Sequence, residues 1–292
     1  MEITASMVKD LREASGAGMM DCKKALSECN GNMEEAMNYL REKGIAKSAK
    51  KESRIAAEGL ANIFVDDNKA VILEVNSETD FVSKNEEFVN MINIIGNSLL
   101  KSNAKTIEEA NNIDTGNGTI SEYIVSMVAK IGEKLSLRRF EIVEKNEDEV
   151  FGKYLHMGGK IAALTIVKGV SEDVAKDVSM QAAAMKPLYL NVSEVPSDVL
   201  ENERKIQKEL AMNEGKPAEI AEKMVEGRIK KYYKEVCLVE QPFVKDGDLS
   251  VAQFVANNGG EILKMIRYEV GEGMEKRNEN FAEEVMNQVN GN

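Results

Sequence analysis

Apolar residues in the first part of the chain recur at helical spacing in three short stretches. Thr4 is a suitable N-cap for the first helix, which ends near Gly16. Gly31 closes the second helix, and the third runs from near Asn32 to Gly44. The apolar faces are Met7, Val8, Leu11 and Ala14, then Cys22, Ala25, Leu26 and Cys29, then Met33, Ala36, Met37 and Leu40. This pattern predicts a minimal three-helix bundle.

A stretch rich in Ala and Lys, residues 43–59, follows the third helix. It contains few large apolar residues, so we interpret it as a helical or flexible linker with few contacts to the rest of the chain. Its basic side chains outnumber its acids and form a local basic patch: Lys43, Lys47, Lys50, Lys51 and Arg54.

From residue 60 the pattern changes to that of strands and longer helices. Residues 60–67 and 69–76 predict two strands joined by a tight turn, and residues 135–145 predict a third. Two apolar faces at helical spacing lie between them: Phe88, Met91, Ile92, Ile95 and Leu99, and Ile120, Tyr123, Ile124, Met127, Val128 and Ile131. The combination predicts an α+β unit.

The same order of patterns then recurs. Residues 150–157 and 160–169 predict two strands, and residues 172–186 predict a helix. The apolar face of that helix is Val174, Val178, Ala182 and Met185. Residues 263–273 are similar to residues 135–145 and predict the last strand. We interpret the recurrence as a duplicated α+β unit, and the larger distance to the last strand as an insertion in the second copy.

The insertion is a charged helical stretch over residues 197–235, interrupted only at residues 213–217. Two narrow apolar stripes flank the interruption: Val199, Ile206 and Leu210, then Ile220, Met224, Val225 and Ile229. Such stripes predict an antiparallel helical hairpin, with a single solvated arm as the alternative. A last amphipathic helix is predicted near the C-terminus, with Phe281, Val285 and Met286 on its apolar face.

The predicted fold class is therefore α+β, in four parts. Residues 1–54 form the three-helix module and linker, and residues 55–145 form the first α+β subdomain. The second α+β subdomain spans residues 146–270, with the helical hairpin at about 196–235, and residues 271–292 form a C-terminal helical module.

The chain of 292 residues has a net charge of −12, and 30% of its residues are charged. This charge argues against a nucleic-acid binder, because phosphate affinity is carried by Lys and Arg, and it suits a protein partner. No apolar run approaches the roughly 18 residues that span a bilayer. The N-terminus is acidic from residue 2 and has no apolar signal core, so we expect a cytoplasmic protein without a membrane contact.

Candidate enzyme chemistry is sparse. The three cysteines, Cys22, Cys29 and Cys237, contain no C-x-x-C pair, so neither a disulfide framework nor a zinc site is indicated. His156 is the only histidine, and no nucleophile is marked beside it. Phosphate-binding and metalloprotease motifs are missing from the sequence, so we expect no cofactor, no metal and no catalytic residue.

The stretch "EVNSETDFVSK", residues 74–84, contains the most unusual apolar residue of the chain. Phe81 follows Asp80 in a polar segment directly after a strand. On pattern alone, a loop Phe belongs most often to its own protein's core. A carboxylate pair made by Glu78 and Asp80 is a further reading, but paired acids need a cleft that separates their pKa values, and the sequence shows only a turn.

This stretch and "LREASGAGMMDCKKAL", residues 11–26, closely resemble the two signature segments of the bacterial elongation factor Ts family. "IAEKMVEGR", "QPFV" and "RYEVGEG" later in the chain are also similar to that family. Ser15 departs from the Thr that is usual there, which is a mild change because both hydroxyls can terminate a helix. The long hairpin is like that of the full-length bacterial form.

The resemblance implies a guanine-nucleotide exchange factor for elongation factor Tu, the GTPase that delivers aminoacyl-tRNA. Such a factor binds the GDP form of Tu, loosens Mg²⁺ and GDP, and leaves when GTP enters. The N-terminal module would resemble ubiquitin-associated domains and dock on the GTPase domain. The factor performs no bond-making chemistry. The stoichiometry, including a dimer or a 2:2 complex with Tu, is left open.

The resemblance also implies roles for particular residues. Asp80 and Phe81, with Thr79 and Val82 beside them, correspond to the turn that intrudes near the magnesium site of Tu. Further partner contacts are expected from Arg12, Met19, Met20 and Lys23 in the first module, and from Lys51 and His156. The alternative function is a non-catalytic adaptor that binds a partner through the same module without accelerating nucleotide release.

Overall fold

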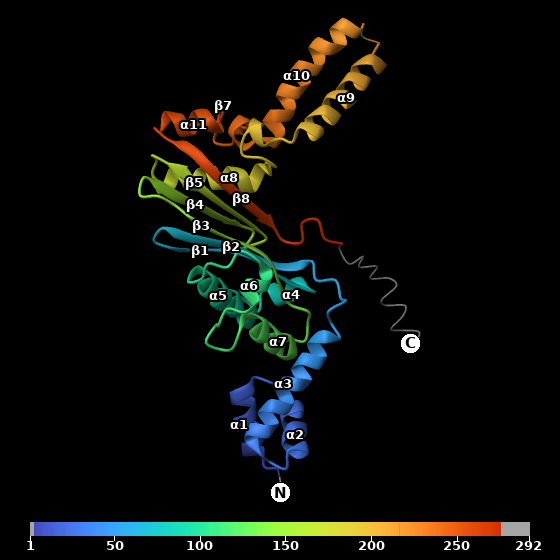
Figure 1. Ribbon diagram of the computed structural model, residues 1–292, viewed down its shortest axis with the longest axis vertical. Helices are drawn as coiled ribbons and strands as arrows, with labels where there is room; N and C mark the ends of the chain where they lie inside the picture. The colour runs from blue at the N-terminus through green and yellow to red at the C-terminus, as the bar shows by residue number, and fades with distance from the viewer. Residues whose placement is uncertain (1–2, 216, 276–292) are drawn as a thin grey trace. The chain divides into compact units, whose positions relative to one another are not determined.

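The computed structural model describes residues 3–215 and 217–275 (Figure 1). Two compact units make up the chain. The first comprises the segments up to residue 64, 73–142 and from residue 269 on, and the second comprises 65–72 and 143–268. The predicted apolar face of the C-terminal helix, from Phe281 onward, lies outside the described residues. In the described part, no helix is long and apolar enough to cross a membrane.

The first three helices are α1 (Ala5–Ser15), α2 (Met19–Glu28) and α3 (Met33–Ala49). Helices α1 and α3 begin where the sequence predicts. The Thr4 hydroxyl accepts a hydrogen bond from the backbone N–H of Met7, and Asn32 caps α3 in the same way. A small common core holds the three helices together: Val8, Leu11, Cys22, Ala25, Leu26 and Ala36.

Helix α3 is longer than predicted, because it continues past Gly44 to Ala49. A mid-helix glycine is unfavourable by about 1 kcal/mol relative to Ala. Here Gly44 lies against α7 (Ile120–Ile131), where an added Cβ would be 3.4 Å from the Cβ of Ala129. Arg41 of α3 also pairs with Glu122 of α7. The expectation of a linker with few contacts is therefore wrong, since tertiary packing extends the helix and covers its end.

The first sheet contains β1 (Glu58–Asp66), β2 (Lys69–Ser77) and β3 (Ser136–Glu144) in the order β1-β2-β3. The central strand β2 is buried on both faces, which explains the apolar run from Ala70 to Leu73. Helix α5 (Glu86–Leu100) packs on β1 at Gly96, where a Cβ would be 2.1 Å from the ring of Phe64. Two short helices, α4 (Asp80–Ser83) and α6 (Ile107–Asn111), join these elements.

The second sheet contains β4 (Glu149–His156), β5 (Ile161–Lys168) and β8 (Glu261–Glu269) in the order β4-β5-β8. Strands β4 and β5 are antiparallel. Helix α8 (Glu172–Met185) packs on both, with Val178 and Ala182 fully buried. Met185 was predicted on that face but is exposed, because the helix ends there and Lys186 turns the chain away with a left-handed φ of 48°.

Both sheets thus consist of a hairpin and a later third strand beside the hairpin's second strand.

Several short elements between α10 and β8 have no clear sequence pattern and were not predicted. They are η2 (Leu238–Glu240), β6 (Pro242–Phe243), β7 (Asp246–Ser250) and α11 (Val251–Asn257), and η1 (Val192–Glu194) lies before the hairpin. The observed fold is a mixed helix and sheet structure, in agreement with the predicted α+β class.

The insertion forms α9 (Ser197–Asn213) and α10 (Ala218–Val236), which run antiparallel as an arm in Figure 1. Part of the predicted stripe is wrong: Ile206, Leu210 and Ile220 are exposed. The buried seam consists of Ala211, Ala221, Val225 and Ile229. Small alanines let the two helices approach closely, so the seam lies beside the line of large apolar residues on which the prediction was based.

We predict that the hairpin can be removed without unfolding the second unit. The core cluster of that unit contains no residue of α9 or α10 in the part of the chain that the structure describes. At the base of the arm, the backbone N–H of Leu188 donates to Val236 O, and the N–H of Leu238 donates to Tyr189 O. Replacing residues 197–234 with a glycine linker keeps these bonds. Thermal unfolding of the shortened protein should stay cooperative, and a broad, non-cooperative transition would contradict the prediction.

Candidate functional site

Residues 77–84, which we name the Phe81 turn, connect β2 to α5 through the one-turn helix α4. Phe81 lies on this helix with 79% of its surface exposed, whereas Phe88, seven residues later, is fully buried. An exposed phenylalanine gives up the 1.5–3 kcal/mol that its burial would yield. Phe81 is therefore not a core residue of the free protein, and the core reading of this residue is wrong.

The base of the turn is firmly held although its tip is exposed. Val82 and Ser83 are buried, and the Ser83 hydroxyl donates a hydrogen bond of 2.6 Å to the backbone oxygen of Asp80. The Ser77 hydroxyl donates to the backbone oxygen of Thr79 at 2.9 Å. Val82 thus anchors the turn in the free protein, and a direct contact with a partner would require it to leave this position.

Two acidic side chains of the turn have separate surroundings. Asp80 is exposed and pairs with Lys84 at 3.6 Å, an exposed i,i+4 pair that contributes little stability. Glu78 accepts a hydrogen bond of 2.6 Å from the backbone N–H of Lys134 and pairs with Arg54 at 3.2 Å. Because each carboxylate is held by a different partner, the two do not form an acid–base pair. Among the described residues, no cluster of His, Cys, Asp and Glu could hold a metal ion.

The first module presents its predicted contact residues at the surface. Met19 and Met20 begin α2, and both are exposed, at 57% and 74%. Adjacent helix positions point in different directions, so at least one was expected to face outward. Arg12 on α1 and Lys23 on α2 are exposed as well. These four side chains are accessible to a partner without rearrangement.

His156 and Lys51 differ in accessibility. His156 is exposed at the end of β4, and its ring stacks on Tyr154 with a centroid distance of 6.1 Å. Met157, which the sequence analysis missed, follows it and is 72% exposed. Lys51 is half-buried and donates to the backbone oxygen of Gly132. Burial and the neighbouring charge of Arg54 lower the pKa of Lys51. Its contact with a partner stays a prediction.

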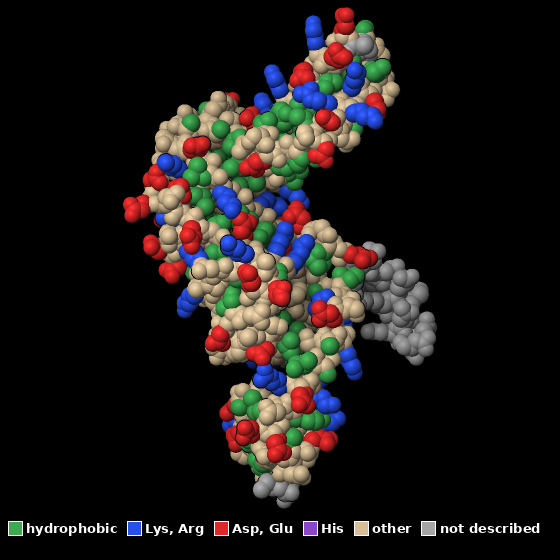
Figure 2. All heavy atoms as spheres, in the orientation of Figure 1, with side chains coloured by type: hydrophobic (Ala, Val, Ile, Leu, Met, Phe, Trp, Pro, Cys, Tyr) green, Lys and Arg blue, Asp and Glu red, His purple; other side chains and the backbone are tan. Residues whose placement is uncertain are grey.

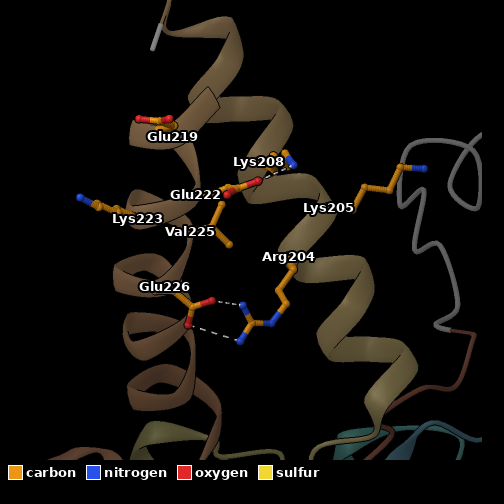
Figure 3. A pocket seen from close by; sticks show the side chains of 8 residues that line it. All are labelled: Arg204, Lys205, Lys208, Glu219, Glu222, Lys223, Val225 and Glu226. Atoms are coloured by element: carbon orange, nitrogen blue, oxygen red, sulfur yellow. Dashed lines mark hydrogen bonds and ion pairs between the residues drawn. The ribbon is translucent and has the colours of Figure 1, made fainter. Parts of the chain in front are cut away.

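A groove on the hairpin is the other candidate site (Figure 3). Arg204 binds Glu226 with two hydrogen bonds, and Lys208 pairs with Glu222 at 3.2 Å. The bond from Arg204 lowers the pKa of Glu226. Lys205 and Lys223 point away from the groove (Figure 3). Figure 2 shows acidic and basic side chains mixed over the arm, so neither charge sign predominates there.

The family model described as elongation factor TS matches residues 78–272. The matched span begins inside the Phe81 turn and includes β3, the whole second sheet and the hairpin. It covers more than half of the 292 residues. The chain belongs to the elongation factor Ts family, the nucleotide exchange factors for elongation factor Tu.

Proposed function

We propose that this protein accelerates the release of GDP from elongation factor Tu by inserting the Phe81 turn beside the Mg²⁺ site of Tu. The observation that carries the proposal is the exposure of Phe81, at 79%, on a turn whose base is anchored. Asp80 lies beside it at the surface and can disturb the polar groups around the metal. The protein then leaves when GTP enters.

The energetics of such an exchange follow from linkage. The exchange factor and GDP each bind Tu, and each weakens the other by the same factor. A coupling of about 3 kcal/mol corresponds to a loss of GDP affinity on the order of a hundred-fold. Mg²⁺ requires near-ideal octahedral geometry, so a small displacement of its surroundings weakens its binding. One inserted aromatic side chain supplies an energy of this size.

Docking is assigned to the first module, which we take to be ubiquitin-associated-like. Met19 and Met20 are adaptable apolar contacts, and Arg12 and Lys23 flank them with positive charge. His156 provides a second contact from the other unit, and Lys51 a third. The role in translation places the protein in the cytoplasm, without a direct nucleic-acid or membrane partner. A mass measurement of the free protein and of its complex with Tu would distinguish a dimer and a 2:2 complex from other stoichiometries.

Titration into Tu loaded with fluorescent GDP tests the function. The rate of GDP release should rise with the concentration of the protein and reach a plateau. Chelating Mg²⁺ beforehand should shrink this stimulation, because the step that the Phe81 turn accelerates has already occurred. An adaptor would bind Tu without changing the rate of release. Equal stimulation with and without Mg²⁺ would show that the protein acts on the nucleotide by another route.

A further inference from the structure

Resting on the proposed function, we propose that Glu133, which lies outside the Phe81 turn, is the positioning residue that holds Phe81 ready for insertion. Glu133 lies in the connection between α7 and β3. It reaches the turn through Thr79, two residues before Phe81.

Glu133 binds Thr79 through both of its carboxylate oxygens. Oε2 of Glu133 accepts the backbone N–H of Thr79 at 2.9 Å, and Oε1 accepts the Thr79 hydroxyl at 2.6 Å. The neighbouring residues exchange a bond in the opposite direction, since Oε1 of Glu78 accepts the backbone N–H of Lys134 at 2.6 Å. We name these four residues, Glu78, Thr79, Glu133 and Lys134, the clasp. Two adjacent residues of each segment thus hold two adjacent residues of the other.

The turn depends on this external support because its own helix is too short to be stable. Helix α4 has four residues, and isolated helices of that length do not form in water. Thr79 occupies the N-cap position, yet no side chain caps α4 in the described structure, because the Thr79 hydroxyl is bound to Glu133. Glu133 therefore supports, from outside the turn, the direction of Phe81 that Val82 and Ser83 anchor from within. An exposed apolar side chain that is already ordered loses less entropy on insertion into a partner.

The same connection also holds the segment that leaves α3. The Lys51 ammonium donates to Gly132 O, and the Lys134 ammonium donates to the backbone oxygens of Glu52 and Arg54. Arg54 in turn pairs with Glu78 of the clasp. Residues 132–134 therefore contact both the segment after α3 and the start of the Phe81 turn. These contacts hold the end of the docking module and the turn in a fixed relation to each other. Docking by α1 and α2 then brings Phe81 to its site in a set orientation.

The test compares two substitutions at Glu133. Glu133→Ala removes both acceptors and should lower the maximum rate of stimulated GDP release by about ten-fold, since small misplacements of a positioned group have large effects on rate. Glu133→Gln should retain most of the rate, because its amide oxygen can accept the Thr79 N–H and its amide nitrogen can donate to the Thr79 hydroxyl. The concentration that gives half-maximal stimulation should change little in both. Glu147→Ala, an exposed glutamate after β3, is the control.

A double-mutant cycle separates positioning from general damage. If Glu133 acts through Phe81, then Glu133→Ala should have no further effect in a Phe81→Ala background. Equal effects of Glu133→Ala in both backgrounds would overturn the positioning role. If Phe81→Ala exchanges as fast as the wild-type protein, the proposed function of the turn itself fails. The two failures are thus distinguishable.

A second readout does not depend on exchange. The chain contains no tryptophan, so Phe81→Trp introduces the only tryptophan, at the tip of the turn, which can be excited selectively over the tyrosines. Fluorescence anisotropy of this variant should fall when Glu133→Ala is added and stay unchanged with Glu133→Gln. Unchanged anisotropy with Glu133→Ala in a folded protein would show that the turn is rigid without the clasp, and would overturn the proposal.

Discussion

Replacing Phe81 with alanine is expected to reduce stimulated GDP release from Tu at least ten-fold while folding stability hardly changes. Burial of a phenylalanine yields about 1.5–3 kcal/mol, and a ten-fold effect on rate needs only about 1.4 kcal/mol. The side chain is 79% exposed in the free protein, so its removal leaves no cavity there. Surface substitutions of this kind change the free energy of unfolding by no more than about 0.5 kcal/mol.

Phe88→Ala provides the matched control. Phe88 lies seven residues further along the chain, on α5, and is fully buried. Its truncation should lower the free energy of unfolding by about 3–5 kcal/mol, because it leaves a cavity in the core. Denaturant unfolding and stopped-flow GDP release, measured on both variants, decide the matter. A Phe81→Ala protein that unfolds early yet exchanges normally while folded would show that Phe81 only packs.

Much of the fold could be predicted because its elements carry strong periodic patterns. The predicted apolar face of α5 is buried, and so is that of α7 except for the half-buried Tyr123 and Ile131. Strand β2 has a run of apolar residues, Ala70 to Leu73, because it is the central strand. The errors arise where packing between helices overrides the local sequence pattern. Gly44 was read as a stop although Ala129 packs against it, and the hairpin seam uses Ala211 and Ala221, which a search for large apolar residues overlooks.

The candidate site was predictable only at its tip. Asp80 and Phe81 stand out in the sequence because an apolar residue follows an acid in a polar segment, and the resemblance gives them a role. Glu133 has no such local signal. Its partner Thr79 is 54 residues away, and only the meeting of the α7–β3 connection with the Phe81 turn brings the two together.

Glu74 is a buried carboxylate of the first unit. It lies fully buried on β2, three strand positions before the Phe81 turn begins. Its carboxylate accepts hydrogen bonds from Arg138 at 2.9 Å, from Arg139 at 2.6 Å and from the backbone N–H of Gly271 at 2.9 Å. Burial by itself would raise the pKa of Glu74, but these bonds, with one from Asn76, outweigh it and lower the pKa.

Glu74→Gln should therefore lower the free energy of unfolding at neutral pH by about 2 kcal/mol, since it removes the buried charge that both arginines share, although Arg139 keeps its pair with Glu272 at 3.7 Å. Glu144→Gln, at the exposed end of β3, is the control and should change the free energy of unfolding by no more than about 0.5 kcal/mol.

Because the pKa of Glu74 is lowered on folding, the contribution of its charge to stability is complete above the ordinary glutamate value of 4.5 and is lost as the pH falls through the lowered value. The difference between wild type and Glu74→Gln should accordingly shrink in acid. Urea unfolding over a series of pH values measures it, and a difference that stays constant down to the acid transition would mean that Glu74 stabilises the unit by packing and not by charge.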